Sequence, residues 1–227
     1  MSTILNIETS TDYCSVAISQ GEAITFSIGA PSTTSHAAII GLYIEEALKQ
    51  CRNIDAVAVS SGPGSYTGLR IGASISKGLC FGLGVPLIAI RTLELMAHAA
   101  IKKQLSPDAL YCPMIDARRM EVFSELFDSS LNHVRETQAD IVTAETYLEY
   151  LDKKTVLFFG NGMPKCKTVL NHPNAHFIED IHPWASEMAS LSAAAFEKKQ
   201  FENTAYFEPY YFKEYHAVIS RNKVLGR

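Results

Sequence analysis

The feature that most constrains the fold of this chain is a pattern that occurs twice. The runs TILNIETS and YCSVAISQ flank a short polar turn near the N-terminus, and ALYCPMIDARRMEVFSELFD repeats this strand, acidic turn and strand. In the second copy, Asp116 stands where Glu8 stands in the first. Each half later has a buried strand that runs into a Gly-x-Gly turn, and the matching glycines are Gly62, Gly64, Gly160 and Gly162. The repeat predicts two lobes of related design.

The order of the expected elements indicates the fold class. In the first half, three strands are followed by a helix in TTSHAAIIGLYIEEALKQC, a strand in IDAVAVSS, a helix in LRIGASISKGLCFGL and a strand in VPLIAI. This alternation predicts an α/β lobe with a mixed sheet flanked by helices. We expect the first lobe to span residues 1–104 and the second residues 105–227, because charged and turn-forming residues interrupt the apolar pattern in HAAIKKQLSPDA. The last segment can pack back on the first lobe.

Composition excludes several classes of protein. With 227 residues, 47% of them hydrophobic, the chain can bury a sizeable core. Its net charge of −4 provides no chain-wide basic field for nucleic acid. The N-terminus has no basic region and no apolar stretch is long enough to span a bilayer, so we expect a cytoplasmic protein without membrane contact. We expect reduced, mostly buried cysteines, which are Cys14, Cys51, Cys80, Cys112 and Cys166.

Four stretches together carry a resemblance to a known family. They are ILNIETST, SSGPGSYTGLRIGAS, IDARRMEVF and the later GNG, and they occur in both halves of the chain. On these stretches the chain resembles the TsaB, or YeaZ, family of bacterial proteins of tRNA threonylcarbamoyladenosine synthesis. The resemblance implies the two-lobed α/β fold of actin, Hsp70 and sugar kinases (the ASKHA fold), with duplicated lobes, mixed sheets and flanking helices.

The resemblance also implies a function and partners. Members of this family are non-catalytic scaffolds and activators of the transferase TsaD, which modifies adenosine 37 of tRNA, with the ATPase TsaE as third partner. By this resemblance the chain has no cofactor of its own, ATP and magnesium act at the level of the complex, tRNA is met through the partners, and isolated chains form homodimers. The alternative is a stand-alone ATP-dependent phosphotransferase or ATPase of the same superfamily. A peptidase is disfavoured because no GxSxG elbow is present.

The glycine-rich loop before the second expected helix has two interpretations. Backbone amides at a helix N-terminus favour an anion, which makes this stretch a candidate anion-binding loop. However, Leu69 stands where a P-loop has lysine, and Thr67 stands where a dinucleotide fingerprint has its third glycine. We therefore favour a structural role, in which glycines shape the turn and Ser65 or Thr67 caps the helix. The loop residues are Gly62, Gly64, Ser65, Thr67 and Gly68.

The acidic residues of the two hairpin turns are candidates for metal binding, as in kinases of this superfamily. Asp116 is followed by Ala117 and then by Arg118 and Arg119, whose bulky side chains would crowd a phosphate unless their guanidinium groups themselves reach it. We therefore expect Glu8 and Asp116 to be solvated or hydrogen-bonded turn acids. Arg118 can form an interface through Glu121 or through a carboxylate of a partner, or be merely exposed.

The first expected helix has one histidine and lacks the second that a metal centre would need there. By resemblance, TsaD holds a metal with an HxxxH pair on this helix, one turn apart on one face. In this chain His36 is followed four residues later by Ile40. We therefore predict no metal site and no catalytic residues.

Surplus apolar and small residues on the two expected helices predict an interface. On the first helix, an apolar stripe would face the sheet, formed by Ala37, Ile40, Ile44, Ala47, Leu48 and Cys51. Outside that stripe lie Ile39, Leu42 and Tyr43, which we expect to be exposed. The second helix has a row of small residues that forms a groove for another helix: Gly68, Gly72 and Ser76. The alternative is close packing between the two helices of one lobe.

The C-terminal stretch RNKVLGR is polar and basic and has no apolar period. We expect deletion from Arg221 to leave the fold intact. The same stretch can make a salt-sensitive contact with a partner or with RNA.

Overall fold

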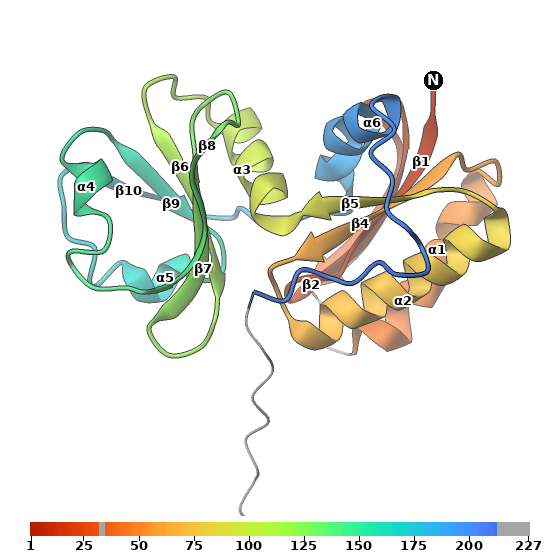
Figure 1. Cartoon of the computed structure of the whole chain (residues 1–227), viewed down its shortest axis with the longest axis horizontal. Coiled ribbons are helices and arrows are strands. Elements are labelled where there is room, and N and C mark those ends of the chain that lie inside the picture. The colour runs from red at the N-terminus through yellow and green to blue at the C-terminus, as the bar shows by residue number, and fades with distance from the viewer. Residues whose placement is uncertain (32–34, 213–227) are drawn as a thin grey trace, which may run out of the picture.

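The computed structural model describes residues 1–31 and 35–212, which form two lobes, each built on a five-stranded sheet (Figure 1). In the first sheet the strand order is β3-β2-β1-β4-β5. The first three strands pair antiparallel, whereas β4 is parallel to both β1 and β5. The strand bounds are Thr3–Glu8 (β1), Tyr13–Gln20 (β2), Ala23–Pro31 (β3), Ala56–Gly62 (β4) and Leu87–Arg91 (β5).

The second sheet repeats this order as β8-β7-β6-β9-β10, with β6 antiparallel to β7 and parallel to β9. Its strand bounds are Leu110–Asp116 (β6), Glu121–Phe127 (β7), His133–Ile141 (β8), Val156–Phe159 (β9) and Ala175–Ile178 (β10). Glu8 and Asp116 are the last residues of equivalent strands. Gly62 and Gly160 occupy equivalent turns with φ of 103° and 97°. The predicted duplication is therefore confirmed, and so is the fold class.

The helices differ between the lobes. In the first lobe, α1 (His36–Gln50) and α2 (Tyr66–Leu83) cover one face of the sheet. The other face packs against η1 (Ala185–Met188) and α6 (Ala189–Glu197), which return from the C-terminal half of the chain. In the second lobe, α4 (Leu148–Leu151) and α5 (Met163–Cys166) are single turns. The second lobe therefore repeats the sheet of the first and shortens its helices.

Helix α3 (Thr92–Lys103) lies between the lobes and contacts both sheets. Leu93 and Met96 belong to a core cluster with residues of β6 and β9, whereas Leu95 packs with Ile4 and Ile88 of the first sheet. The predicted division after residue 104 falls just beyond this shared helix and stays a prediction.

The segment after α6 also lies on the first lobe, and we call residues 202–212 the strap. The backbone amide of Glu202 donates to the carbonyl of Leu87 at 2.9 Å, which extends the edge of the first sheet. Phe207 is buried in the core of the same lobe. The stretch from Arg221 lies outside the described residues, so the prediction about its deletion stays a prediction.

All five cysteines are free thiols, of which only Cys51 is partly exposed. Burial raises the pKa of Cys14 and Cys112 to about 12, and that of Cys80 and Cys166 to about 11.

None of the helices within the described ranges is both long enough and apolar enough to cross a membrane.

Candidate functional site

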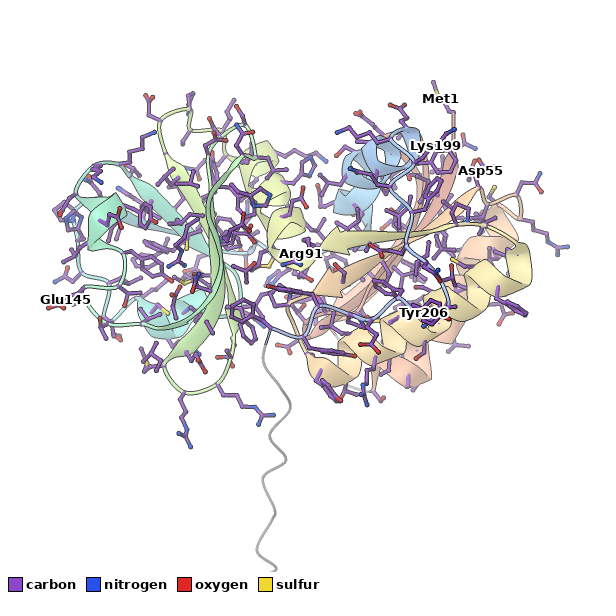
Figure 2. The ribbon with its side chains drawn as sticks, viewed as in Figure 1. Met1, Asp55, Arg91, Glu145, Lys199 and Tyr206 are labelled. Carbon is purple, nitrogen blue, oxygen red and sulfur yellow. The ribbon has the colours of Figure 1, made fainter. Side chains whose placement is uncertain are left out.

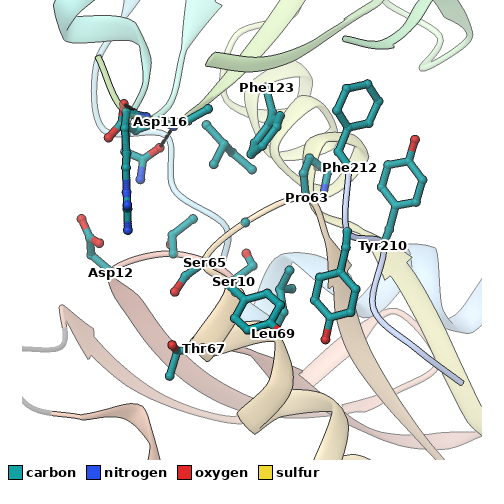
Figure 3. Close-up of a pocket in the computed structure, with 18 of the residues that line it drawn as sticks. Ser10, Asp12, Pro63, Ser65, Thr67, Leu69, Asp116, Phe123, Tyr210 and Phe212 are labelled. Carbon is teal, nitrogen blue, oxygen red and sulfur yellow. Dashed lines mark hydrogen bonds between the residues drawn. The ribbon is translucent and has the colours of Figure 1, made fainter. Parts of the chain in front are cut away.

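A cleft of about 880 Å³ lies between the two lobes (Figure 3). Its walls come from five places: the β1–β2 turn, the start of α2 with the loop before it, the β6–β7 hairpin, the turn after β9 and the end of the strap. The structure thus brings the candidate anion loop and the second acidic turn together. The lining includes Ser10, Gly64, Ser65, Asp116, Arg118 and Tyr211.

The glycines of the loop allow the β1–β2 turn to lie directly on α2. A methyl group on Gly64 would lie 2.3 Å from the carbonyl oxygen of Ser10, and one on Gly68 would lie 2.1 Å from that of Thr9. The Thr9 hydroxyl donates to the carbonyl of Gly68 at 2.8 Å. Ser65 Oγ accepts from the amide of Gly68 at 3.3 Å, so the prediction that Ser65 caps the helix is confirmed. The role of the loop in anion binding stays a prediction.

The row of small residues on α2 faces inward, which corrects the prediction of an open groove there. Gly68, Gly72 and Ser76 are all buried. A methyl group on Gly72 would lie 2.3 Å from the hydroxyl oxygen of Thr9 and 3.3 Å from the side chain of Val59. The space that these residues leave is therefore filled by the hairpin and sheet of the same lobe, and another protein cannot enter it.

Glu8 is a buried carboxyl beneath the cleft. It is fully shielded from solvent, and its Oε1 accepts from the amide of Ser10 at 2.5 Å. Burial raises the pKa of Glu8 to about 7, against the opposing effect of hydrogen bonds from Ser10, Ser60 and Thr9. Of the two expected forms of this turn acid, the hydrogen-bonded one is confirmed and the solvated one is wrong.

Asp116 is half-exposed at the cleft and already paired with a cation. Its carboxylate forms an ion pair with Lys165 and accepts from the amide of Arg118 at 3.2 Å. Lys165 also donates to the carbonyl of Glu121 at 2.6 Å, which fixes the ammonium beside the hairpin. This arrangement supports the interpretation of Asp116 as a hydrogen-bonded turn acid. Arg118 is exposed and has a positive φ of 72°; its role at an interface stays a prediction.

Aromatic residues of the strap line the same cleft, and sequence reasoning missed them. Tyr210, Tyr211 and Phe212 reach the cleft from the C-terminal end, opposite Phe123 of β7 (Figure 3). A signal was present, since the run FEPYYF is rich in aromatic residues. The run has neither helical nor strand periodicity, so nothing in the sequence indicates that it lines the cleft.

The outer surface of α1 and α2 corrects the exposure predicted for two residues. Ile39 and Tyr43 are half-buried and pack against the core of their own lobe, whereas Leu42 is 64% exposed. A shallow groove of about 690 Å³ runs between the two helices. Its lining residues are Ala37, Ile40, Tyr66, Thr67, Arg70, Ile71, Ser74 and Ile75.

His36 has a hydrogen-bonding role. Its Nε2 donates to the carbonyl oxygen of Thr11 at 2.7 Å, which ties the start of α1 to the β1–β2 turn.

In the second lobe, Glu125, His133 and Glu136 have ligand-type atoms within 4.8 Å of one another. His133 Nδ1 and Glu125 Oε1 are already paired at 2.5 Å, and the Thr137 hydroxyl donates to the other oxygen of Glu125 at 2.9 Å.

Two lobes with the same strand order, facing each other across a cleft, give this chain the two-lobed, actin-like ASKHA fold. The structure of YeaZ from Pseudomonas aeruginosa has this fold, with a TM-score of 0.80 at 23% identity over 93% of this chain and 100% of that chain. A family model described as TsaD, tRNA N6-adenosine threonylcarbamoyltransferase, matches residues 30–223.

Sequence comparison gives a narrower assignment. The chain is 30% identical over 166 residues to a Bacillus subtilis protein named tRNA threonylcarbamoyladenosine biosynthesis protein TsaB, covering 70% of this chain and 71% of that protein. It is 39% identical over 126 residues to the protein of the same name from Haemophilus influenzae, covering 53% of this chain and about half, 52%, of that protein. The chain belongs to the family of the matching model and, within it, to the TsaB, or YeaZ, family.

Proposed function

We propose that this protein is a non-catalytic scaffold and activator subunit in the synthesis of threonylcarbamoyladenosine at position 37 of tRNA. In this role it partners a TsaD-like transferase in the cytoplasm, together with a TsaE-like ATPase. The observation that carries the proposal is membership of the TsaB family, whose curated relatives have this biosynthesis in their names.

Two features of the cleft support an accessory role. The ion pair with Lys165 neutralises the carboxylate of Asp116, and Glu8 is buried below the surface of the cleft. A carboxylate that holds a metal nucleotide must be both ionised and free to bind the metal, whereas Asp116 is occupied by Lys165 and Glu8 is shielded from the cleft. ATP and magnesium therefore act, in this proposal, at the level of the complex.

The outer surface of α1 and α2 supports a partner site in the first lobe. The groove between the helices is lined mainly by apolar and small side chains, and Leu42 is an exposed apolar residue of α1. Methyl groups on Gly41 and Gly78 would meet no atom within 4 Å apart from the adjoining backbone of their own helix, so both helices have bare backbone at their outer surfaces. An apolar helix of TsaD, or of a second copy of this chain, fits such a surface.

Leu42→Glu is expected to weaken association with TsaD by at least about tenfold and to leave the melting temperature nearly unchanged, because Leu42 is 64% exposed in the isolated chain. The matched control is Leu105→Glu, which changes a leucine that is 65% exposed in the loop after α3. Titration calorimetry on both variants measures the effect. Equal affinities for TsaD in the two variants would contradict the assignment of this surface.

The purified chain alone is expected neither to hydrolyse ATP appreciably nor to retain stoichiometric zinc or iron. The reason is the paired Asp116 and the single His36, whose imidazole is hydrogen-bonded to Thr11. Elemental analysis and a phosphate-release assay measure these properties. One transition metal per chain would overturn this prediction. Tight binding of ATP with magnesium would support the alternative of a stand-alone phosphotransferase or ATPase.

The decisive test of the proposed function is reconstitution. TsaD and TsaE from the same source cell are incubated with threonylcarbamoyl-adenylate, ATP and unmodified tRNA, with and without this chain, and the nucleosides are analysed by mass spectrometry. We expect the modified adenosine only when this chain is present. Equal yields without it would refute the activator role.

A further inference from the structure

The strap spans the boundary between the two lobes. It begins at the edge of the first sheet and runs along α2 to the cleft, where its last described residue contacts the second lobe (Figure 1). The lobes are also connected by α3 with its flanking loop and by the segment that leads from β10 to η1. The strap is thus a further crossing, and it lies at the mouth of the cleft.

The first part of the strap is firmly anchored to the first lobe. Phe207 is 8% exposed, and the Lys77 ammonium donates to the carbonyls of Ala205 and Phe207, each at 3.1 Å. The amide of Tyr210 donates to the carbonyl of Ser61 at 2.7 Å. The Arg91 guanidinium lies 3.6 Å from the centre of the Tyr210 ring, at the junction of the lobes (Figure 2).

The end of the strap closes one side of the cleft. The Tyr211 ring lies 5.1 Å from that of Tyr66, and Tyr211 hydrogen-bonds to Arg70 on the first turns of α2. The Phe212 ring meets Phe123 edge-on at 5.8 Å. Since Phe123 belongs to β7, this aromatic pair joins a segment anchored on the first lobe to the sheet of the second.

We propose that the strap is an interlobe latch. Its anchored part holds the Phe212 ring against Phe123, and this contact fixes the angle between the lobes and keeps the cleft narrow. When the contact is broken, the lobes turn about the α3 connection and the cleft opens. The latch is a property of the isolated chain and does not depend on the proposed function in tRNA modification.

The test measures the distance between spin labels on the two lobes. The labels are attached at Glu45→Cys on α1 and Glu145→Cys before α4, both exposed, in a Cys51→Ser background of the full-length chain. The remaining cysteines are buried thiols with raised pKa values, so they react slowly with the label. We expect Phe212→Ser and Phe123→Ser each to lengthen the mean distance by more than about 2 Å and to broaden its distribution.

The matched control is Tyr206→Ser, which removes a strap aromatic that is 82% exposed and is expected to leave the distribution unchanged. Phe212→Leu keeps an apolar contact with Phe123 and is expected to restore most of the original distribution. It also provides a milder test of the contact if the serine variants unfold. An unchanged distance in Phe212→Ser and Phe123→Ser, or an equal shift in Tyr206→Ser, would overturn the latch.

Discussion

Gly68→Ala is expected to lower the free energy of unfolding by roughly 3 kcal/mol or more, one of the largest effects of a single methyl group in this chain. The added carbon would lie 2.1 Å from the carbonyl oxygen of Thr9, which is backbone and cannot rotate away. Relief requires that the β1–β2 turn move off α2, which would also break the hydrogen bond from the Thr9 hydroxyl to Gly68. Denaturant titration measures the loss.

Gly78→Ala is the matched control, because it makes the same change on the outer surface of the same helix. Apart from the adjoining helix backbone, no atom lies within 4 Å of the added carbon, so the higher helix propensity of alanine is expected to stabilise the protein by up to about 1 kcal/mol. If both variants were equally stable, the close packing of the hairpin on α2 would be refuted.

Glu8→Gln is expected to change how stability depends on pH. The pKa of Glu8 is raised from 4.5 to about 7 in the folded protein, so the folded state binds more protons than the unfolded state between these values. Stability from this group is therefore present in full below about pH 4.5 and is lost as pH rises through about 7. The loss amounts to roughly 3 kcal/mol, since one pKa unit corresponds to about 1.4 kcal/mol.

The glutamine variant carries no titrating group at this site, so its free energy of unfolding is expected to fall less between pH 5 and pH 8 than that of the parent chain. Glu149→Gln, a change at a side chain that is 73% exposed, is the control and is expected to follow the parent chain. Denaturant titrations across this pH range give the comparison. Parallel curves for Glu8→Gln and the parent would show that Glu8 is ionised in the folded protein.

The sheets of both lobes could be predicted because their signals are local and repeated. Each copy has an acidic residue at the end of its first strand and a positive-φ glycine where the parallel neighbour ends. The N-terminus of α2 could be narrowed to a cap at Ser65 or Thr67, since the preference of a hydroxyl residue for a cap depends only on the next turn of helix, and the structure has Ser65 there.

The burial of the small residues on α2 could not be predicted, because their spacing does not indicate which segment packs against them. Gly68, Gly72 and Ser76 allow close approach equally to a partner or to a neighbouring segment, and Thr9, distant in sequence, is the segment that approaches. The exposure of Tyr43 depends in the same way on β3, against which α1 packs. Such contacts are set by the path of the chain, which helical periodicity does not contain.

The return of α6 and the strap to the first lobe has a consequence for how the protein is made. The ribosome releases residues 1–104 long before residues 185–212, yet Ile4 and Ile88 of the first sheet are covered by Met188 and Ala195. During synthesis this face of the first sheet remains uncovered while the second lobe emerges and folds. The second lobe can therefore form as a unit on the nascent chain, and the lobe that is translated first is the last to be completed.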